Sequence, residues 1–219
     1  MSTYRDEAQA HPDGAPPRPR VRDRIFETAC GLFYKHGIRA VGVDAIACEA
    51  GTNKMSFYRS FASKDELVSE YLRDRQREFW DWWHETIAPY AGNPRRQIEA
   101  LFESHLAVVE DNECRGCALG NAAVEMSGDN DALSTLVRDY KNKVRHQLRQ
   151  MARAMGARNA EALGDSLMLL MDGSYFTRLV FPGDSGPVSS LMGAVRCLID
   201  CHMPAAAAAR APPAGAPPP

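Results

Sequence analysis

The sequence predicts an all-α protein with a small N-terminal domain of three helices and a larger helical body. Two observations carry this prediction. Apolar residues recur at helical spacing between residues 21 and 203, and no segment alternates as a strand would. Basic residues gather near the N-terminus: residues 18–64 hold nine Lys and Arg against four Asp and Glu, although the net charge of the chain is −2. A basic domain on an acidic body indicates a local site for a polyanion.

The N-terminal domain is expected to hold three helices with recognisable ends. Gly37 follows the apolar stripe of the first helix, at a place where a left-handed residue is favoured. Gly51 ends the second helix, and Asn53 is a good N-cap for the third. The three helices are expected at residues 21–36, 43–50 and 54–61.

A capping box marks the start of the body. Ser63 and Glu66 stand three residues apart before an apolar run, so each can satisfy a free backbone N–H group. The long helix that follows is apolar on more than one face and ends near Pro89, so it is expected to join the two domains. Later helices are expected at about residues 94–110, 117–126, 131–155, 159–180 and 188–203.

Both ends of the chain are rich in proline and alanine and have almost no large apolar residues. Such segments cannot bury enough apolar surface to offset the entropy of ordering, so both are expected to be disordered. The expected organisation is a basic arm at residues 1–20, a helix-turn-helix domain at 21–66, a helical body at 67–203 and a Pro/Ala tail at 204–219.

Export and membrane insertion are not indicated. No run of apolar residues is long enough to cross a bilayer, and the first 20 residues lack the apolar core of a secretory signal. The six cysteines are therefore expected to be reduced thiols. These features predict a cytoplasmic protein without a membrane partner.

The second and third helices, with a tight turn at Gly51 between them, predict a helix-turn-helix unit that places the third helix in the major groove of DNA. Phe57 and Phe61, four residues apart, share its inner face. Its first turn is expected to reach base edges, and its flanks, with the start of the next helix, are expected to meet phosphates. The residues expected to bind bases are Asn53, Lys54, Met55 and Ser56, and those expected to bind phosphates are Tyr58, Arg59, Ser60 and Lys64.

An ordinary helical hairpin with a solvated charged face is the alternative, and it leaves the basic character of this domain unexplained. The arm leads into the first helix with four basic residues, which either contact DNA or only make the arm soluble. These residues are Arg18, Arg20, Arg22 and Arg24.

Residues 25–70 resemble the TetR family of bacterial repressors. The matching residues are Ile25-Phe26, Ala29, Phe33, His36-Gly37, Val43, Ile46-Ala47, Ala50-Gly51, Phe57-Tyr58, Phe61 and Ser63-Lys64-Asp65-Glu66-Leu67. The resemblance implies that Tyr58 and Lys64 contact phosphates and that the start of the third helix reads bases. It also implies a dimer on operator DNA, most often acting as a repressor that a small molecule releases.

The chain departs from the family pattern at two places. The family usually has Ser or Thr just before its second helix, whereas this chain has Val41-Gly42. A phosphate contact there must come from a backbone N–H group, at Gly42 or Val43. Met55 stands where a small residue is common, and it is placed to contact a thymine methyl group.

The resemblance implies that the body binds an effector and forms a homodimer through its last two long helices, packed as a four-helix bundle with those of a partner. Residues 115–125 also resemble a segment found in a subset of these regulators. Methionine and aromatic residues suit varied apolar ligands, although the same residues fit a plain core equally well. The candidate lining residues are Trp83, Phe102, His105, Leu106, Cys117, Met168, Met171, Asp172 and Tyr175.

Cys114 and Cys117 are separated by two residues at a helix start beside Arg115, an environment that favours the thiolate. A redox- or electrophile-sensing regulator is therefore an alternative function, and a helical thiol–disulfide enzyme is a remoter one; simple packing of small residues explains the pair as well. Cys197 and Cys201 have no second pair, so no metal site is expected. No cofactor motif or catalytic motif is present, and no catalytic residue is assigned. The sequence specifies neither the effector nor the operator, nor whether the regulator represses or activates.

Overall fold

The computed structural model describes residues 19–126, 131–182 and 186–204. The arm and tail predicted to be disordered therefore lie outside the described residues, apart from positions 19, 20 and 204. The described residues form helices and connecting loops without a strand, which confirms the all-α prediction. The elements are α1 (Val21–His36), α2 (Val43–Glu49), α3 (Lys54–Ser60), α4 (Lys64–Ile87), η1 (Ala88–Tyr90), α5 (Pro94–Glu110), α6 (Ala118–Glu125), α7 (Asp131–Ala154), α8 (Ala160–Val180), η2 (Pro187–Ser190) and α9 (Leu191–His202).

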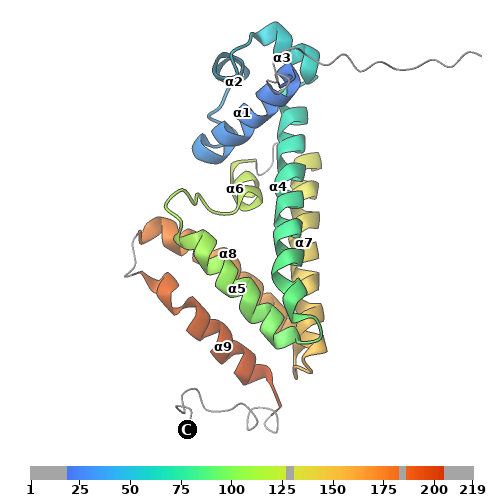
Figure 1. Ribbon diagram of the computed structural model, residues 1–219, viewed down its shortest axis with the longest axis vertical. Coiled ribbons are helices and arrows are strands. Elements are labelled where there is room, and N and C mark those ends of the chain that lie inside the picture. Colours follow the sequence, from blue (N-terminus) through green and yellow to red (C-terminus); the bar gives the residue numbers. More distant parts are fainter. Residues whose placement is uncertain (1–18, 127–130, 183–185, 205–219) are drawn as a thin grey trace, which may run out of the picture.

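The helices form a head and a body that α4 connects. Helices α1, α2 and α3 lie together at one end of the molecule (Figure 1). Helix α4 runs from this head down the length of the body, side by side with α7, while α5, α8 and α9 form the other side (Figure 1). The short α6 lies between the head and the body, and this position makes it important for the site (Figure 1).

The predicted caps are present. The Asn53 side chain accepts a hydrogen bond from the Ser56 N–H at 2.9 Å, and Ser63 Oγ accepts one from the Glu66 N–H at 3.0 Å. Gly37 has a φ of 88° directly after α1, a conformation that favours glycine. The one notable difference is the start of the last helix: α9 begins at Leu191, because Pro187–Ser190 forms a separate 3₁₀ turn.

The head has an apolar centre that continues into the body. Phe57 and Phe61 of the helix-turn-helix are both buried, as their spacing predicted, and they pack with Ile25 and Ile46 in one cluster. Phe33 meets Tyr71 of α4 with ring centroids 5.6 Å apart. Because buried side chains of the head and the body belong to the same cluster, the orientation of the head depends on α4 and its neighbours.

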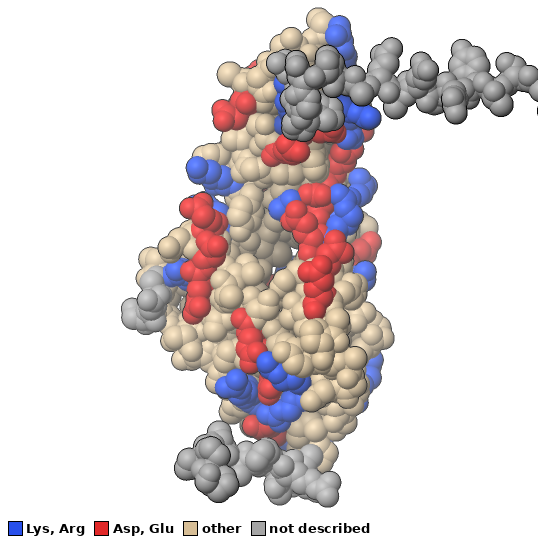
Figure 2. Space-filling view, viewed as in Figure 1, with Lys and Arg blue, Asp and Glu red and all other residues tan. Residues whose placement is uncertain are grey.

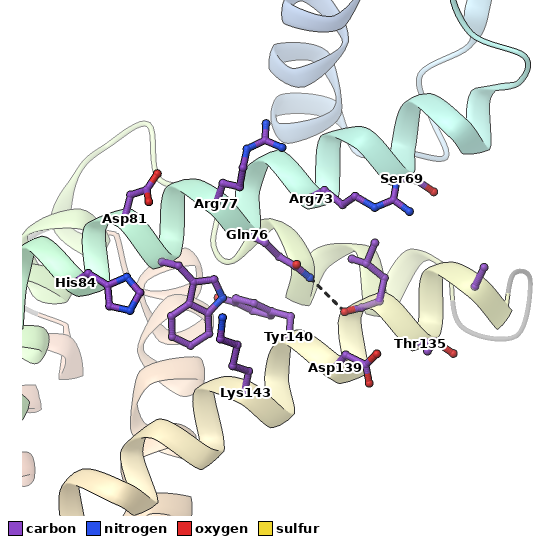
Figure 3. A pocket seen from close by; sticks show the side chains of 13 residues that line it. Ser69, Arg73, Gln76, Arg77, Asp81, His84, Thr135, Asp139, Tyr140 and Lys143 are labelled. Atoms are coloured by element: carbon purple, nitrogen blue, oxygen red, sulfur yellow. Dashed lines mark hydrogen bonds between the residues drawn. The ribbon is translucent and has the colours of Figure 1, made fainter.

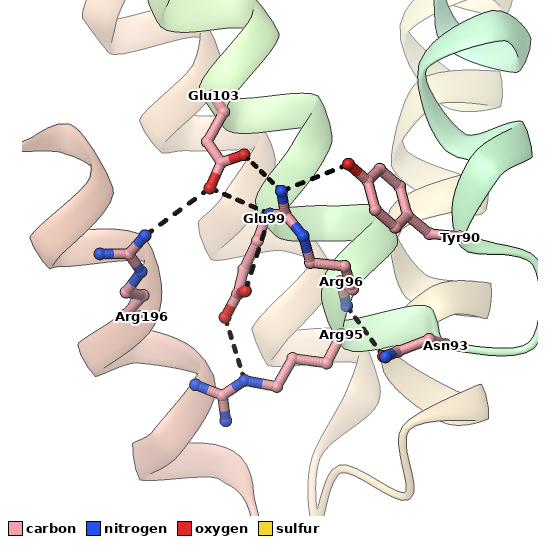
Figure 4. A network of polar contacts seen from close by, with 7 residues as sticks. All are labelled: Tyr90, Asn93, Arg95, Arg96, Glu99, Glu103 and Arg196. Carbon is pink, nitrogen blue, oxygen red and sulfur yellow. Dashed lines mark hydrogen bonds and ion pairs between the residues drawn. The ribbon is translucent and has the colours of Figure 1, made fainter. Parts of the chain in front are cut away.

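Helix α9 is attached to α5 by a network of charged side chains (Figure 4). Arg96 donates two hydrogen bonds to Glu103, at 2.9 and 2.8 Å, and Glu103 also lies 3.6 Å from Arg196 of α9. Arg95 donates to Asp200 of α9 at 2.7 Å. Exposed pairs of this kind contribute little individually, about 0–1 kcal/mol, so their main effect is to fix how α9 lies on α5.

Helices α7 and α8 pack closely at Gly164. Arg145 and Arg149 of α7 both bind Asp165, with shortest distances of 2.7 and 2.5 Å. A Cβ atom at Gly164 would lie 2.6 Å from the Arg149 side chain and 2.7 Å from its backbone nitrogen. Glycine is therefore required for this approach of the two helices.

None of the described helices is long and apolar enough to span a membrane.

The substitution Gly164→Ala is expected to lower the free energy of unfolding by about 1–3 kcal/mol, because the added methyl group forces α7 and α8 apart. Urea denaturation followed by circular dichroism measures this change. Gly31→Ala in α1 is the control, since a Cβ there meets nothing within 4 Å. That variant should be neutral or more stable by about 0.5–1 kcal/mol. Equal behaviour of the two variants would contradict the close packing of α7 on α8.

Candidate DNA-binding face and effector cavity

Helix α3 presents one face to its own core and the other to solvent. Phe57 is fully buried, whereas Met55 is 66% exposed and Tyr58 is 51% exposed. Lys54 and Arg59 are also exposed. The residues predicted to reach DNA thus lie on the accessible face, and a duplex could contact them without unfolding the head.

Several of these residues also bind within the head. Lys54 Nζ lies 3.1 Å from Asp44 Oδ2 of α2, in an exposed ion pair. Arg59 donates a hydrogen bond to the Met55 sulfur at 3.5 Å. The side-chain oxygen Oδ1 of Asn53 caps α3, and Ser60 Oγ donates to the Ser56 carbonyl at 2.9 Å. Asn53 and Ser60 therefore have structural roles, in addition to the DNA contacts predicted for them.

Lys64 connects the start of α4 to the loop after α1. Its Nζ donates a hydrogen bond to the Ile38 carbonyl at 2.6 Å. Partial burial lowers the pKa of this ammonium group below its usual value. Since an ammonium group has three N–H donors, two remain for a phosphate, and the phosphate contact stays a prediction.

The start of α2 offers backbone donors. Gly42 is its N-cap, with φ −88° and ψ 160°, and no side chain of the described residues caps the helix there. The N–H groups of Val43 and the next residues are thus left for a phosphate, as the departure from Ser or Thr requires. Figure 2 shows Lys and Arg at both the upper and the lower end of the molecule and streaks of Asp and Glu along its middle.

A cavity of about 320 Å³ lies within the body, between α4, α5, α7, α8 and the loop that leads into α6. It contains five of the nine predicted lining residues: His105, Cys117, Met171, Asp172 and Tyr175. Trp83 and Phe102 are instead buried in the core. Leu106 and Met168 pack half-buried against the core, outside the lining of this cavity.

The prediction missed the contributions of α4 and α7. Phe79 and Trp82 line the cavity from α4, and Tyr140 and Lys141 line it from α7. Phe79 and Tyr140 meet edge to face, with ring centroids 5.2 Å apart. Helical spacing marks these residues as inward-facing, but it does not tell whether an inward side chain meets a neighbour or a hollow.

His105 is the most buried polar group of the cavity, with 1% of its surface exposed. Its Nε2 lies 2.8 Å from Ser174 Oγ, which in turn donates to the Met171 carbonyl at 2.8 Å. Burial lowers the pKa of His105 to about 4, since a charged ring would lose its hydration. The ring is therefore neutral at pH 7.

The segment 114–125 joins the cavity to the head. Gly116 and Cys117 line the cavity. On the other side, the hydroxyl of Tyr34 in α1 accepts a hydrogen bond from the Arg115 N–H at 2.8 Å and donates one to the Gly116 carbonyl at 3.2 Å. At the far end of α6, Glu125 Oε2 accepts from the Arg39 N–H at 2.9 Å. The segment therefore contacts both the cavity and the head.

A larger hollow of about 780 Å³ lies between α4 and α7 (Figure 3). Tyr140 and Lys143 point from α7 towards α4, and Gln76 Nε2 donates to the Leu136 carbonyl at 3.3 Å (Figure 3). Its charged lining residues are exposed, and none of its residues belongs to segment 114–125. The smaller cavity is therefore the better candidate for an effector, because it alone of these two reaches that segment.

The cysteines form no centre within the described part of the chain. All six are free thiols, and Cys117 Sγ accepts a hydrogen bond from the Gly120 N–H at 3.4 Å as the N-cap of α6. Among the described residues, no three His, Cys, Asp or Glu side chains gather in a way that could hold a metal ion.

The substitution Tyr34→Phe should lower the free energy of unfolding by about 1–2 kcal/mol, because it leaves the Arg115 N–H and the Gly116 carbonyl without their partner. Tyr58→Phe is the matched control: its hydroxyl is exposed and bonds to no described residue. Urea denaturation of both variants compares them. A Tyr34→Phe protein as stable as the control would show that this junction contributes no stability.

Stability is expected to depend on pH through His105. The unfolded histidine takes up a proton near pH 6.5, whereas the buried ring does so only near pH 4. The contribution of His105 to the free energy of unfolding is therefore complete above about pH 6.5. It decreases by up to about 3 kcal/mol as the pH falls towards 4. Urea denaturation between these pH values should show that the free energy of unfolding changes less with pH in His105→Phe than in the native protein. The exposed-site control His146→Phe should keep the native dependence; the same slope in all three proteins would refute the assignment.

Known proteins resemble this chain both in sequence and in fold. Residues 25–71 match the family described as bacterial regulatory proteins, tetR family. The HTH-type transcriptional repressor KstR2 of Mycobacterium tuberculosis is 33% identical over 97 residues, which are 43% of this chain and 46% of that protein. The HTH-type transcriptional repressor DhaR of a Mycobacterium species is 29% identical over 133 residues, or 58% and 64% of the two chains. The chain thus matches less than two thirds of the length of either repressor.

Solved structures extend the likeness to the body. A TetR-family transcriptional regulator from Streptomyces coelicolor superposes with a TM-score of 0.77 at 24% identity, covering 83% of this chain and 89% of that one. A TetR transcriptional regulator from Chloroflexus aurantiacus gives a TM-score of 0.68 at 21% identity, covering 82% and 92%. Identity at this level shows a shared fold. Residues 25–71 therefore match the bacterial regulatory proteins of the tetR family, and the described chain shares its fold with solved TetR-family regulators.

Proposed function

We propose that this protein is a dimeric transcription repressor that binds operator DNA through its head and leaves the operator when a small molecule occupies the cavity. The observation that carries the proposal is the double role of segment 114–125, which lines the cavity and hydrogen-bonds to the head. The matched relatives KstR2 and DhaR are named as repressors, which favours repression over activation.

Dimerisation is supported by the outer face of α8 and α9. Leu169 is 73% exposed and Phe176 is 70% exposed, and such large apolar side chains usually have a partner. A second copy packed on this face would form a four-helix bundle with two-fold symmetry. Two heads related in this way would read a palindromic operator, with a half-site spacing set by the dimer.

Release of the operator would follow from a difference in the affinity of the ligand for two shapes of the protein. A ligand that contacts Cys117 and the loop before α6 favours the arrangement of segment 114–125 that suits the ligand. Tyr34 and Glu125 transmit that arrangement to the head, so the distance between the two heads of a dimer would change. The ligand must therefore bind the DNA-incompetent shape more tightly than the competent one.

The alternatives have less support. The names of the matched relatives do not favour a thiol-based sensor or a thiol–disulfide enzyme. Cys117 has a role in capping α6, which accounts for it without redox chemistry. We infer no catalytic activity and place the protein in the cytoplasm with its operator.

Binding to DNA should weaken in Tyr58→Ala and Lys64→Ala for operator and random duplexes alike, since both residues are assigned to phosphates. Each lost phosphate contact should reduce the slope of log K against log salt by about 1. Lys54→Ala should additionally relax base preference. Fluorescence anisotropy on an operator selected from a random duplex pool, repeated at several salt concentrations, measures both effects.

The control is Lys143→Ala, which removes the same charge from α7 and should bind DNA like the native protein. Because Lys64 also supports the head through Ile38, the stability of that variant is checked first. A Lys54→Ala protein with unchanged affinity and base preference would show that α3 does not enter the groove as proposed.

A further inference from the structure

An ion pair joins α2 and α3 on the part of the head that is proposed to meet DNA. Lys54 Nζ lies 3.1 Å from Asp44 Oδ2, and the two side chains are 58% and 75% exposed. Lys54 is the first residue of α3, and Asp44 lies in the first turn of α2. Asp44 therefore belongs to the same turn as the backbone N–H groups that are proposed to receive a phosphate.

An unpaired carboxylate at this place would oppose the binding of DNA, because it would repel the phosphates. The ammonium group of Lys54 cancels the charge of Asp44, so the pair as a whole neither attracts nor repels a polyanion strongly. Exposed pairs of this kind contribute little to the stability of a fold. The pair is therefore expected to affect the binding of DNA more than the folding of the head.

The pair also limits what Lys54 can bind. A lysine ammonium group has three N–H donors, and the bond to Asp44 uses one of them. Two donors remain, and guanine presents two acceptors, O6 and N7, in the major groove. Because Asp44 already holds Nζ, the long side chain of Lys54 loses less conformational freedom when it meets a base.

We propose that Asp44 and Lys54 read the operator as one unit, in which Asp44 is a positioning residue that directs the Lys54 ammonium group to a guanine and keeps it from acting as a general phosphate contact. This inference rests on the proposed function, because it names how the head distinguishes an operator from other DNA. It gives Asp44 a role in specificity, although a carboxylate does not itself attract DNA.

A double-mutant cycle in the full chain tests the unit with Asp44→Asn, Lys54→Ala and the variant that combines them. Fluorescence anisotropy measures binding to a random duplex and to an operator selected from a random pool. Lys54→Ala leaves Asp44 without its partner, so this variant should bind the random duplex about tenfold less tightly near 0.1 M salt. The double variant carries no charge at either position, so its affinity for the random duplex should return to the native value.

The preference for guanine should respond differently from the affinity. Replacing each guanine of the operator in turn by 7-deazaguanine removes the N7 acceptor. At one guanine this replacement should weaken binding of the native protein about tenfold, and it should have no effect on Lys54→Ala or on the double variant. In Asp44→Asn the same replacement should cost less than about threefold, while affinity for the random duplex rises about tenfold, because the unpaired Lys54 can bind phosphates.

Glu49→Gln is the matched control. It removes the same charge from the last residue of α2 and should leave the preference for guanine unchanged. Asp44→Ser repeats the test with a second neutral residue that suits a helix start. Urea denaturation shows that each variant is folded before its binding to DNA is measured.

The proposal is overturned if Lys54→Ala loses the same affinity for the random duplex with and without Asp44→Asn. It is also overturned if Asp44→Asn keeps the native preference for guanine, or if no guanine of the operator responds to Lys54→Ala. In each of these cases a native protein that binds the selected operator leaves the proposed function in place. A native protein that binds no duplex at low salt contradicts the proposed function itself, and this inference with it.

Discussion

The hydroxyl group of Tyr34 is the contact that holds the segment before α6 to the head. It accepts a hydrogen bond from one backbone group of the segment before α6 and donates to another, while Glu125 bonds the far end of the same segment to the loop after α1. The segment is therefore attached to the head at both ends and forms part of the cavity wall between them. The proposed release of DNA would rely on this double attachment.

Charge is arranged differently at the two sites. Lys54 and Arg59 of α3 are exposed to solvent, although Lys54 is paired with Asp44 of α2. In the cavity, Lys141 and Arg75 are each paired with a carboxylate, and the buried His105 is neutral because burial lowers its pKa. The head therefore presents basic groups at its surface, whereas the basic groups of the cavity lie beside carboxylates in its wall.

Much of the fold could be predicted from local patterns. The caps at Asn53 and Ser63 are where the spacing placed them, and the phenylalanines at positions 57 and 61 are buried as their four-residue separation indicated. The site was less predictable. Trp83 and Phe102 were expected in the cavity and lie in the core, while Phe79 and Tyr140 line the cavity without having been expected. Periodicity distinguishes inward from outward positions, but the hollow between α4, α5, α7 and α8 results from how these helices pack.

The sequence by itself determined the helices, their ends, the exposed face of α3 and the likeness of residues 25–71 to a family of regulators, because each of these follows from residues close together in the chain. Only the tertiary structure decided which side chains share a cavity and how that cavity meets the head. Tyr34 and Gly116 are 82 positions apart, and His105 and Ser174 are 69 apart. Contacts at such separations depend on the packing of whole helices, which short-range spacing does not encode.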